Sequence, residues 1–143
     1  MLELHAIARA LNEGRVRYLL AGGYAGILHG VPRTTIDVDF MIDPEPQNVS
    51  KAIEVLESLG LVPDSRDVEE ILGMGGTTFT NDREVDVITS PVLGSFETFW
   101  KRKKTVAYRN VRINVLSLKD HRAILEKLGR KRDLDDLEYL GKI

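Results

Sequence analysis

The sequence of 143 residues contains no cysteine, which excludes disulfide bonds, thiolate metal sites and a cysteine nucleophile. It also lacks any apolar run near the roughly 18 residues that a membrane-spanning helix requires. The N-terminal stretch MLELHAIARALNEG is amphipathic and has no signal-peptide pattern. A chain of this length is large enough to bury one hydrophobic core. We therefore expect a single domain over residues 1–143, located in the cytoplasm and without membrane contact.

Neither sign of charge dominates the composition. The formal net charge is -2 and charged residues make up 29% of the chain, as in ordinary soluble globular proteins. The charges are nevertheless unevenly distributed, because residues 101–132 contain 12 Lys and Arg against only Asp120 and Glu126. Such a region is either a surface that attracts a polyanion or a solvated face, and the sequence leaves both open.

Hydrophobic periodicity and turn residues predict an α/β (α+β) fold, in which helices pack on a small mixed β-sheet. Phe96–Lys103 stays ambiguous, and the glycine-rich Gly73–Gly76 is expected to be a mobile loop. The expected helices are Leu2–Leu11, Tyr24–His29, Val49–Leu59, a short one at Val68–Leu72, one after Ser117 to about Leu128, and Leu134–Leu140. The expected strands are Val16–Ala21, Ile36–Ile42, the hairpin Thr77–Thr80 with Glu84–Ile88, and the hairpin Thr105–Tyr108 with Val111–Leu116, which turns at Arg109 and Asn110.

The segment from Tyr18 to Asp43 concentrates residues that suit phosphate and metal chemistry. Gly22 and Gly23 follow a predicted strand, where glycines let backbone amides approach a ligand and a helix N-terminus favours phosphate; alone, such a pair is more often a tight turn. Asp37 and Asp39 alternate with apolar residues, so two carboxylates point from one face of a strand. Hard oxygen ligands of this kind suit Mg²⁺ or Mn²⁺. Two solvent-facing acids on an edge strand are the competing interpretation.

The glycine pair and the acids, taken together with their spacing, favour a phosphate and metal site over a simple turn and solvent-facing acids. Thirteen residues separate Gly23 from Asp37, and a third acid, Asp86, lies between Val85 and Val87 on a later predicted strand. With this arrangement the chain resembles the nucleotidyltransferase superfamily, the DNA polymerase β-like fold. Its motifs are most similar to the small branch related to AbiEii-type toxins. The matching motifs are GGYA at 22–25, RTTID at 33–37 and GRKRDLDDL at 129–137.

The resemblance implies a metal-dependent enzyme that transfers NMP from an NTP to an acceptor hydroxyl on RNA, protein or a small molecule, with release of pyrophosphate. Asp37, Asp39 and Asp86 would be the catalytic residues and would bind Mg²⁺ or Mn²⁺. One ion would hold the triphosphate, and the other would lower the pKa of an acceptor hydroxyl near Asp86. The implied nucleotide-binding residues are Gly22, Gly23, Arg33, Thr34 and a lysine for which Lys127 is the candidate.

Other interpretations of the same residues are also open. The fold could serve as a non-catalytic module of a toxin-antitoxin or regulatory complex, and a small helical partner protein could bring the acceptor. A DxD phosphatase or glycosyltransferase is remote, because Phe40 and Met41 follow the acids where such a phosphatase needs threonine. Asp133 is either functional or paired with a neighbouring arginine, and pairing is the preferred interpretation. His121 is expected at the surface or half-buried.

Overall fold

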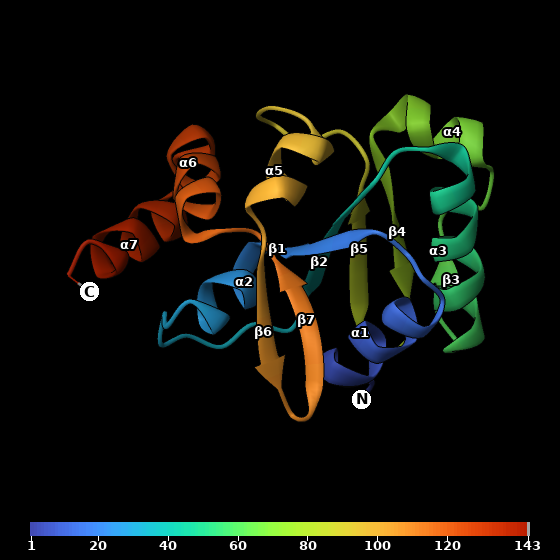
Figure 1. Ribbon diagram of the computed structural model, residues 1–143, viewed down its shortest axis with the longest axis horizontal. Coiled ribbons are helices and arrows are strands. Elements are labelled where there is room, and N and C mark those ends of the chain that lie inside the picture. Colours follow the sequence, from blue (N-terminus) through green and yellow to red (C-terminus); the bar gives the residue numbers. More distant parts are fainter. Residues whose placement is uncertain (143) are drawn as a thin grey trace.

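The computed structural model, which describes residues 1–142, is a mixed seven-stranded sheet with helices on both faces (Figure 1). This confirms the expected fold class. The strands are β1 (Tyr18–Ala21), β2 (Val38–Ile42), β3 (Val62–Pro63), β4 (Gly76–Thr80), β5 (Glu84–Ile88), β6 (Lys104–Tyr108) and β7 (Val111–Val115). The helices are α1 (Leu4–Glu13), α2 (Gly22–Leu28), α3 (Pro46–Ser58), α4 (Val68–Met74), α5 (Phe96–Arg102), α6 (Leu118–Leu128) and α7 (Lys131–Leu140).

The strand order places the acidic motifs at the centre of the sheet. The order is β3-β4-β5-β2-β1-β7-β6. β2 is antiparallel to β1 and parallel to β5, and β1 is also parallel to β7. Two segments that are some forty residues apart in sequence, β2 and β5, are therefore neighbours. In Figure 1, α6 and α7 lie at one end of the molecule, and α3 and α4 lie at the other.

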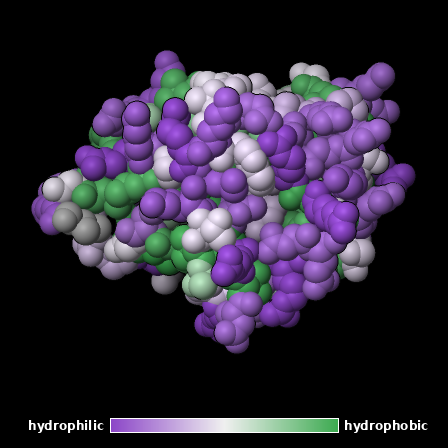
Figure 2. Space-filling model, viewed as in Figure 1, coloured by the Kyte–Doolittle hydropathy of each residue, from purple (hydrophilic) through white to green (hydrophobic). Residues whose placement is uncertain are grey.

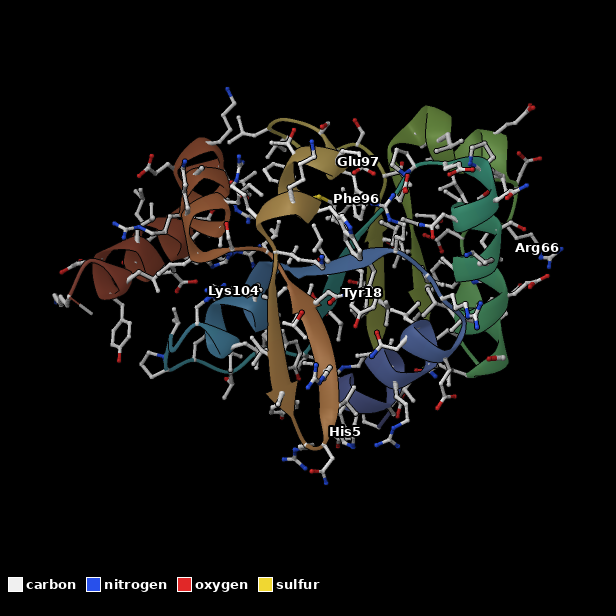
Figure 3. All side chains as sticks on the ribbon, in the orientation of Figure 1. His5, Tyr18, Arg66, Phe96, Glu97 and Lys104 are labelled. Atoms are coloured by element: carbon white, nitrogen blue, oxygen red, sulfur yellow. The ribbon has the colours of Figure 1, made fainter. Side chains whose placement is uncertain are left out.

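The two faces of the sheet bury different sets of side chains. Tyr18, Leu20 and Phe40 belong to the larger core, which α1 and α3 cover with buried leucine, isoleucine, valine and alanine side chains. Leu19 and Met41 alternate with them and face a smaller core formed with Phe96 and Phe99 of α5 (Figure 3). Because side chains alternate along a strand, the residues next to Phe40 and Val87 face this second, less covered side.

Most of the expected elements are present. The turn of the β6–β7 hairpin is at Arg109 and Asn110, whose φ angles of 49° and 66° are those of a tight hairpin turn. Ser117 begins α6 by accepting a hydrogen bond from the backbone N–H of Asp120 at 3.1 Å, and Gly129 ends it in the left-handed conformation. The ambiguous segment is helix α5, which Ser95 caps.

Two expectations were wrong. Residues 36 and 37 do not join the strand, which begins at Val38, and the side chain of Ile36 is 64% exposed. The backbone oxygen of Ile36 instead accepts a hydrogen bond from Nε of buried Arg83 at 2.7 Å. The glycine-rich Gly73–Gly76 is not a separate loop. Its first half ends α4, Gly75 is the left-handed cap, and Gly76 begins β4.

The outer surface is mostly polar. Figure 2 shows a hydrophilic face on which hydrophobic groups are small and separate. Among residues 1–142, no helix has both the length and the hydropathy needed to cross a bilayer.

Candidate active site

The turn between β1 and α2 is shaped to leave room for a carboxylate. Ala21 lies opposite Asp39 in the register of β1 and β2. Gly22, the next residue, has a φ of +64°, and a Cβ at this position would overlap the carboxylate of Asp39. A residue with a side chain would therefore be strained in its backbone and would displace Asp39. The predicted glycine turn and the acidic strand are thus parts of one local structure.

Asp39 and Asp86 are neighbours in the parallel register of β2 and β5, and both are half-buried. Thr78 Oγ1 donates a hydrogen bond to Asp86 Oδ1 at 2.7 Å and so fixes that carboxylate. Burial, followed by the negative charge and hydrogen bonding of Asp86 and the charge of Asp37, raises the pKa of Asp39 to about 7, while the charge of Arg132 opposes this rise. Two adjacent carboxylates therefore ionise together only at a cost, unless a cation lies between them.

A central cavity of about 370 Å³ opens beside this pair. Its walls combine residues that are far apart in the sequence, because they include the glycine turn after β1, the acidic strands β2 and β5, and the start of α7. The predicted site residues that line it are Gly22, Gly23, Arg33, Asp37, Asp39 and Asp86. Those that the sequence did not single out as site residues include Thr35, His121, Arg130, Arg132 and Asp136.

Two predicted nucleotide-binding residues lie elsewhere. Thr34 and Lys127 are exposed, and neither is among the residues that line the central cavity. The residues of α6 that face the cavity are 121, 124, 125 and 128, which form one helical stripe at i, i+3, i+4 and i+7, and Lys127 falls outside it. Arg130 and Arg132 supply the positive charge instead, and the terminal GRKRD motif was their signal in the sequence.

The arginines that line the central cavity, Arg33, Arg130 and Arg132, form its basic wall. Ion pairs hold two of them in place. Arg33 Nη1 donates to Asp136 Oδ2 at 2.8 Å, and Arg130 Nε donates to Asp133 Oδ2 at 2.7 Å. Asp133 also accepts a hydrogen bond from the backbone N–H of Arg130, so the pairing expected for Asp133 is present. Burial disfavours the charged form of Asp133, but the hydrogen bonds from Arg130 outweigh burial and lower its pKa. Within residues 1–142, Arg132 has no ion-pair partner.

His121 is buried, with 2% of its surface exposed, so the expectation of a surface or half-buried residue was wrong. It lies on the cavity-facing stripe of α6, and its ring is 5.9 Å from that of His29. Burial, with a smaller effect from His29, lowers the pKa of His121 to about 4. The ring is therefore neutral at physiological pH and packs as part of the wall.

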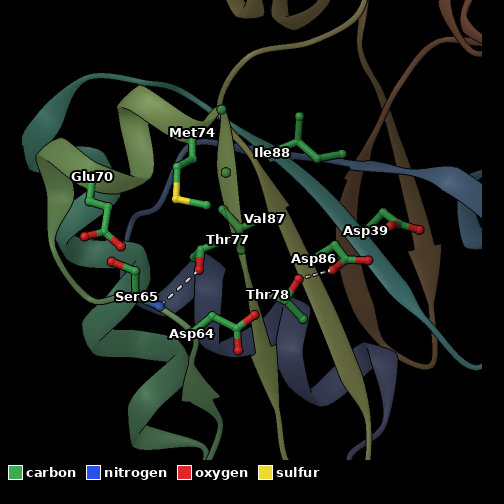
Figure 4. A pocket seen from close by; sticks show the side chains of 12 residues that line it. Asp39, Asp64, Ser65, Glu70, Met74, Thr77, Thr78, Asp86, Val87 and Ile88 are labelled. Carbon is green, nitrogen blue, oxygen red and sulfur yellow. Dashed lines mark hydrogen bonds between the residues drawn. The ribbon is translucent and has the colours of Figure 1, made fainter.

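A second cavity of about 460 Å³, here called the edge cavity, also borders the carboxylate pair (Figure 4). Asp39 and Asp86 line both cavities. Ile88 lines both cavities as well, and the remaining wall of the edge cavity comes from Val87 of β5, from β4, from α4 with its cap, and from the loop before α4. Its polar side chains are Asp64, Ser65, Glu70, Thr77 and Thr78. Asp64 and Glu70 have no direct signal in the sequence, whereas Thr78 lies in a predicted hairpin strand and stands opposite Asp86 in the observed register.

The acids do not form a complete cage for a metal ion. Across residues 1–142, no three His, Cys, Asp or Glu side chains are grouped closely enough to hold one. Asp37 is exposed and precedes the strand, so the preformed part is the pair Asp39 and Asp86. This donor set fits Mg²⁺, which is commonly bound by one or two carboxylates and completes its octahedral shell with water and substrate phosphates.

Comparisons with known proteins connect this geometry to a class. No family model and no curated protein matches the sequence. Among solved structures, the chain is similar to a candidate nucleotidyltransferase from Thermotoga maritima, with a TM-score of 0.67, 18% identity, and coverage of 98% of this chain and 91% of that one. It is also similar to the lincosamide antibiotic adenylyltransferase LnuA bound to lincomycin, with a TM-score of 0.68, 19% identity, and coverage of 94% and 92%.

A third similar structure is the antibiotic-resistance factor ANT(2'')-Ia, with a TM-score of 0.67, 14% identity, and coverage of 96% of this chain and 80% of that one. At such identities the likeness concerns the fold. The chain therefore has the nucleotidyltransferase fold, as the motifs predicted.

Proposed function

We propose that the chain is a metal-dependent nucleotidyltransferase that transfers NMP from an NTP to an acceptor hydroxyl. The observation that carries the proposal is the pair Asp39 and Asp86, aligned on adjacent strands and facing a cavity that Arg130 and Arg132 also line. Carboxylates that need a cation, together with the charge of Arg132, which has no ion-pair partner within residues 1–142, match the two demands of a metal-bound triphosphate. The similar structures that are adenylyltransferases support the same reaction type.

The nucleotide has a defined place in this proposal. The triphosphate lies between Gly22 and the arginines, because the missing Cβ leaves space there and the guanidinium groups favour phosphate oxygens. The base lies against the apolar side chains that line the central cavity, which include Met41, Leu116, Ile124 and Leu128. A volume of about 370 Å³ falls within the range of small-molecule sites.

Asp39 and Asp86 would hold the Mg²⁺ or Mn²⁺ ion, with Asp37 at the mouth of the cavity adding negative charge. When bound, the ion would neutralise charge on the phosphates and polarise the reacting phosphorus. The residues themselves position the reactants: the hydrogen bond from Thr78 fixes Asp86, and the arginines bind the departing pyrophosphate. Catalysis by such a site comes mainly from positioning and charge stabilisation.

A nucleotide-binding assay tests the proposal. Purified protein is titrated with each labelled NTP in the presence of Mg²⁺, Mn²⁺ or EDTA, and at least one NTP should bind only with metal. Asp39→Asn and Asp86→Asn should each weaken that binding about tenfold or more, as loss of groups around a metal commonly does. Asp135→Asn, at an exposed position outside the cavity, should not. Unchanged binding in both site variants would remove the pair from the mechanism.

The motif resemblance supports a finer version, in which the chain belongs beside AbiEii-type toxins and acts in the cytoplasm with a small helical partner. Mass spectrometry of RNA, protein and small molecules from expressing cells should then show a nucleotide adduct that is absent with Asp39→Asn. A chain that binds nucleotide and co-purifies with a partner, yet leaves no adduct, would instead be the non-catalytic module.

A further inference from the structure

We propose that the free edge of β6 binds an extended, acidic segment of a partner protein, which adds to the sheet as a further strand. Two features point to this partner: backbone groups of β6 that face away from the sheet, and nearby cations that have no acidic partner. The residues of β6 line neither the central cavity nor the edge cavity. Binding at β6 is therefore independent of the proposed nucleotidyl transfer.

The backbone of β6 is open on one side. β6 is the outermost strand at one end of the sheet (Figure 1). Two turn residues join it to β7, so Tyr108 and Val111, which flank the turn, form a hydrogen-bonded pair. By the alternation of an antiparallel ladder, Val106 also bonds to β7, whereas the N–H and C=O groups of Thr105 and Ala107 point away from it. Both residues are exposed, and these groups are free to pair with an added strand.

β6 is held in place from the side that faces the core. Val106 and Tyr108 pack against the larger core, and the ring of Tyr108 makes an edge contact with that of His5 at a centroid distance of 6.4 Å. The strand is therefore formed before a partner binds, so docking costs conformational entropy mainly in the added segment.

The charge around β6 selects an acidic partner. Residues 101–116 contain six Lys and Arg and no Asp or Glu. Arg102 is paired with Asp120. Within residues 1–142 the other five have no ion-pair partner, and they are Lys101, Lys103, Lys104, Arg109 and Arg112. Because these cations lie at both ends of β6 and on the neighbouring β7, a segment with carboxylates at its two ends complements them.

A nucleic-acid strand fits this surface less well than a peptide. Proteins that bind single strands stack bases on aromatic rings, but the rings next to β6 are already in use. Lys103 Nζ lies 4.0 Å from the ring centroid of Trp100, which also stacks on Phe96. Arg109 lies over the ring of Tyr108, with Cζ 5.6 Å from its centroid. What remains free is a strand edge with positive charge, which suits strand addition by a peptide.

A second copy of the chain is also a poor partner for β6. Pairing of β6 with its own counterpart, in either direction, brings Lys103 and Lys104 beside Arg109 or beside the same lysines of the other copy. Like charges that lie opposite each other destabilise a sheet. The other edge strand, β3, is two residues long and includes Pro63, which has no N–H to donate. The partner is therefore a different, acidic segment.

Binding of a designed peptide to the full chain tests the proposal. The probe is the acetylated, amidated peptide Glu-Glu-Val-Thr-Val-Glu-Glu. One comparison peptide carries N-methyl groups on two adjacent central residues, which keeps the charge and removes strand-pairing N–H groups from both of its edges. A second replaces every Glu by Lys, and a short oligouridylate stands for nucleic acid. Affinity is measured by fluorescence polarisation at low salt and at 0.5 M NaCl, and amide hydrogen exchange is measured by NMR.

The acidic peptide should bind and should slow exchange of the Thr105 and Ala107 amides, while the Val106 amide, which already bonds to β7, should change little. The N-methylated peptide should bind about tenfold more weakly or less tightly still, as the loss of two backbone hydrogen bonds predicts. The lysine peptide should not bind. Salt should weaken the acidic peptide, because it screens the cations.

Variants of the chain separate the role of charge from that of the backbone. Lys104→Gln and Arg109→Gln should each weaken binding about two- to fivefold, as expected for exposed ion pairs. Arg122→Gln, at an exposed position of α6, is the control and should leave it unchanged. Ala107→Pro removes an N–H that points away from β7, which an edge strand tolerates, and should weaken binding about two- to tenfold. Its urea unfolding midpoint verifies that it folds.

Four results would each overturn the proposal. The first is no binding of the acidic peptide, and the second is equal binding of the N-methylated peptide, which would leave charge alone as the cause. The third is tighter binding of oligouridylate, which would make the surface one for nucleic acid. The fourth is slow exchange of the Thr105 and Ala107 amides without any peptide, together with self-association in sedimentation, which would assign the edge of β6 to a second copy of the chain.

Discussion

Replacing Asp39 with Asn should remove a pH dependence from the stability of the unliganded protein. In the folded protein the pKa of Asp39 rises from 3.8 to about 7, so the folded state keeps a proton that the unfolded chain releases near pH 4. The stability that this proton contributes is fully present below about pH 4 and is lost as the pH rises through 7. The separation of about three pH units is worth about 4 kcal/mol at most. Partial contact of Asp39 with water reduces the expected effect to about 1–3 kcal/mol.

The assay must separate this effect from that of His121. The pKa of His121 falls from 6.5 to about 4 on folding, so its contribution to stability is present above pH 6.5 and is lost as the pH falls. The two groups act in opposite directions over nearly the same pH range, and the stability of the unmodified protein alone does not distinguish them. Urea unfolding of both the unmodified protein and Asp39→Asn, in EDTA at several values between pH 4.5 and 8.5, isolates Asp39 in the difference.

The difference in free energy of unfolding, variant minus unmodified protein, should grow by about 1–3 kcal/mol in favour of the variant from pH 4.5 to 8.5. Any pH-independent effect of the Asn side chain on stability shifts this difference equally at every pH, so it does not change how the difference varies with pH. Asp135→Asn, which alters an exposed acid, should give a flat difference. A flat difference for Asp39→Asn as well would refute the idea that folding raises the pKa of Asp39.

Two further substitutions test the structure around the site. Gly22→Ala should abolish metal-dependent nucleotide binding and lower the free energy of unfolding in urea by about 1–3 kcal/mol, because the new Cβ would meet Asp39. The control is Gly60→Ala, which is also at positive φ but has open space around it. This variant should lose only the stability that backbone strain costs, and it should keep nucleotide binding. Arg83→Met should cost about 2–4 kcal/mol, because buried Arg83 donates to the backbone oxygens of Ile36 and Leu2 at 2.7 Å each. Exposed Arg112→Met is its control, and equal unfolding midpoints for these two variants would contradict the role of Arg83.

Local patterns in the sequence were enough to predict the centre of the fold. The glycine pair, the alternation around Asp39 and the hairpin that carries Asp86 depend on neighbours within a few residues, so their periodicity and turns appear directly in the sequence. The parallel pairing of β2 with β5 joins two such patterns. The sequence did not predict this pairing, because no local rule sets which strands become neighbours; the family resemblance implied only that Asp86 joins the site of Asp37 and Asp39.

The errors occur where distant contacts decide the structure. Residues 36 and 37 continue the alternation of the strand, yet Arg83 from the β4–β5 turn takes the backbone oxygen of Ile36 and the strand starts later. Lys127 was the candidate for the phosphate-binding lysine, but it is exposed and lies outside the stripe of α6 that lines the central cavity. Asp64 and Glu70 are ordinary surface acids in the sequence, and only the packing of α4 beside β4 brings them into one wall.

The basic wall of the central cavity depends on contacts between the two ends of the chain. Arg33, just before the acidic strand, donates to Asp136 of α7, and Val31 packs with Leu125 and Leu140 in a small separate core. These contacts hold α7 against the N-terminal half, and α7 in turn carries Arg132, whose charge lowers the pKa of Asp39 against the effect of burial. The terminal motif therefore affects the carboxylates electrostatically across the cavity. Burial and the charge of Asp86 raise the pKa of Asp39 more than Arg132 lowers it, so the packing of α7 supplies the positive charge that favours ionisation of Asp39 and binding of a cation.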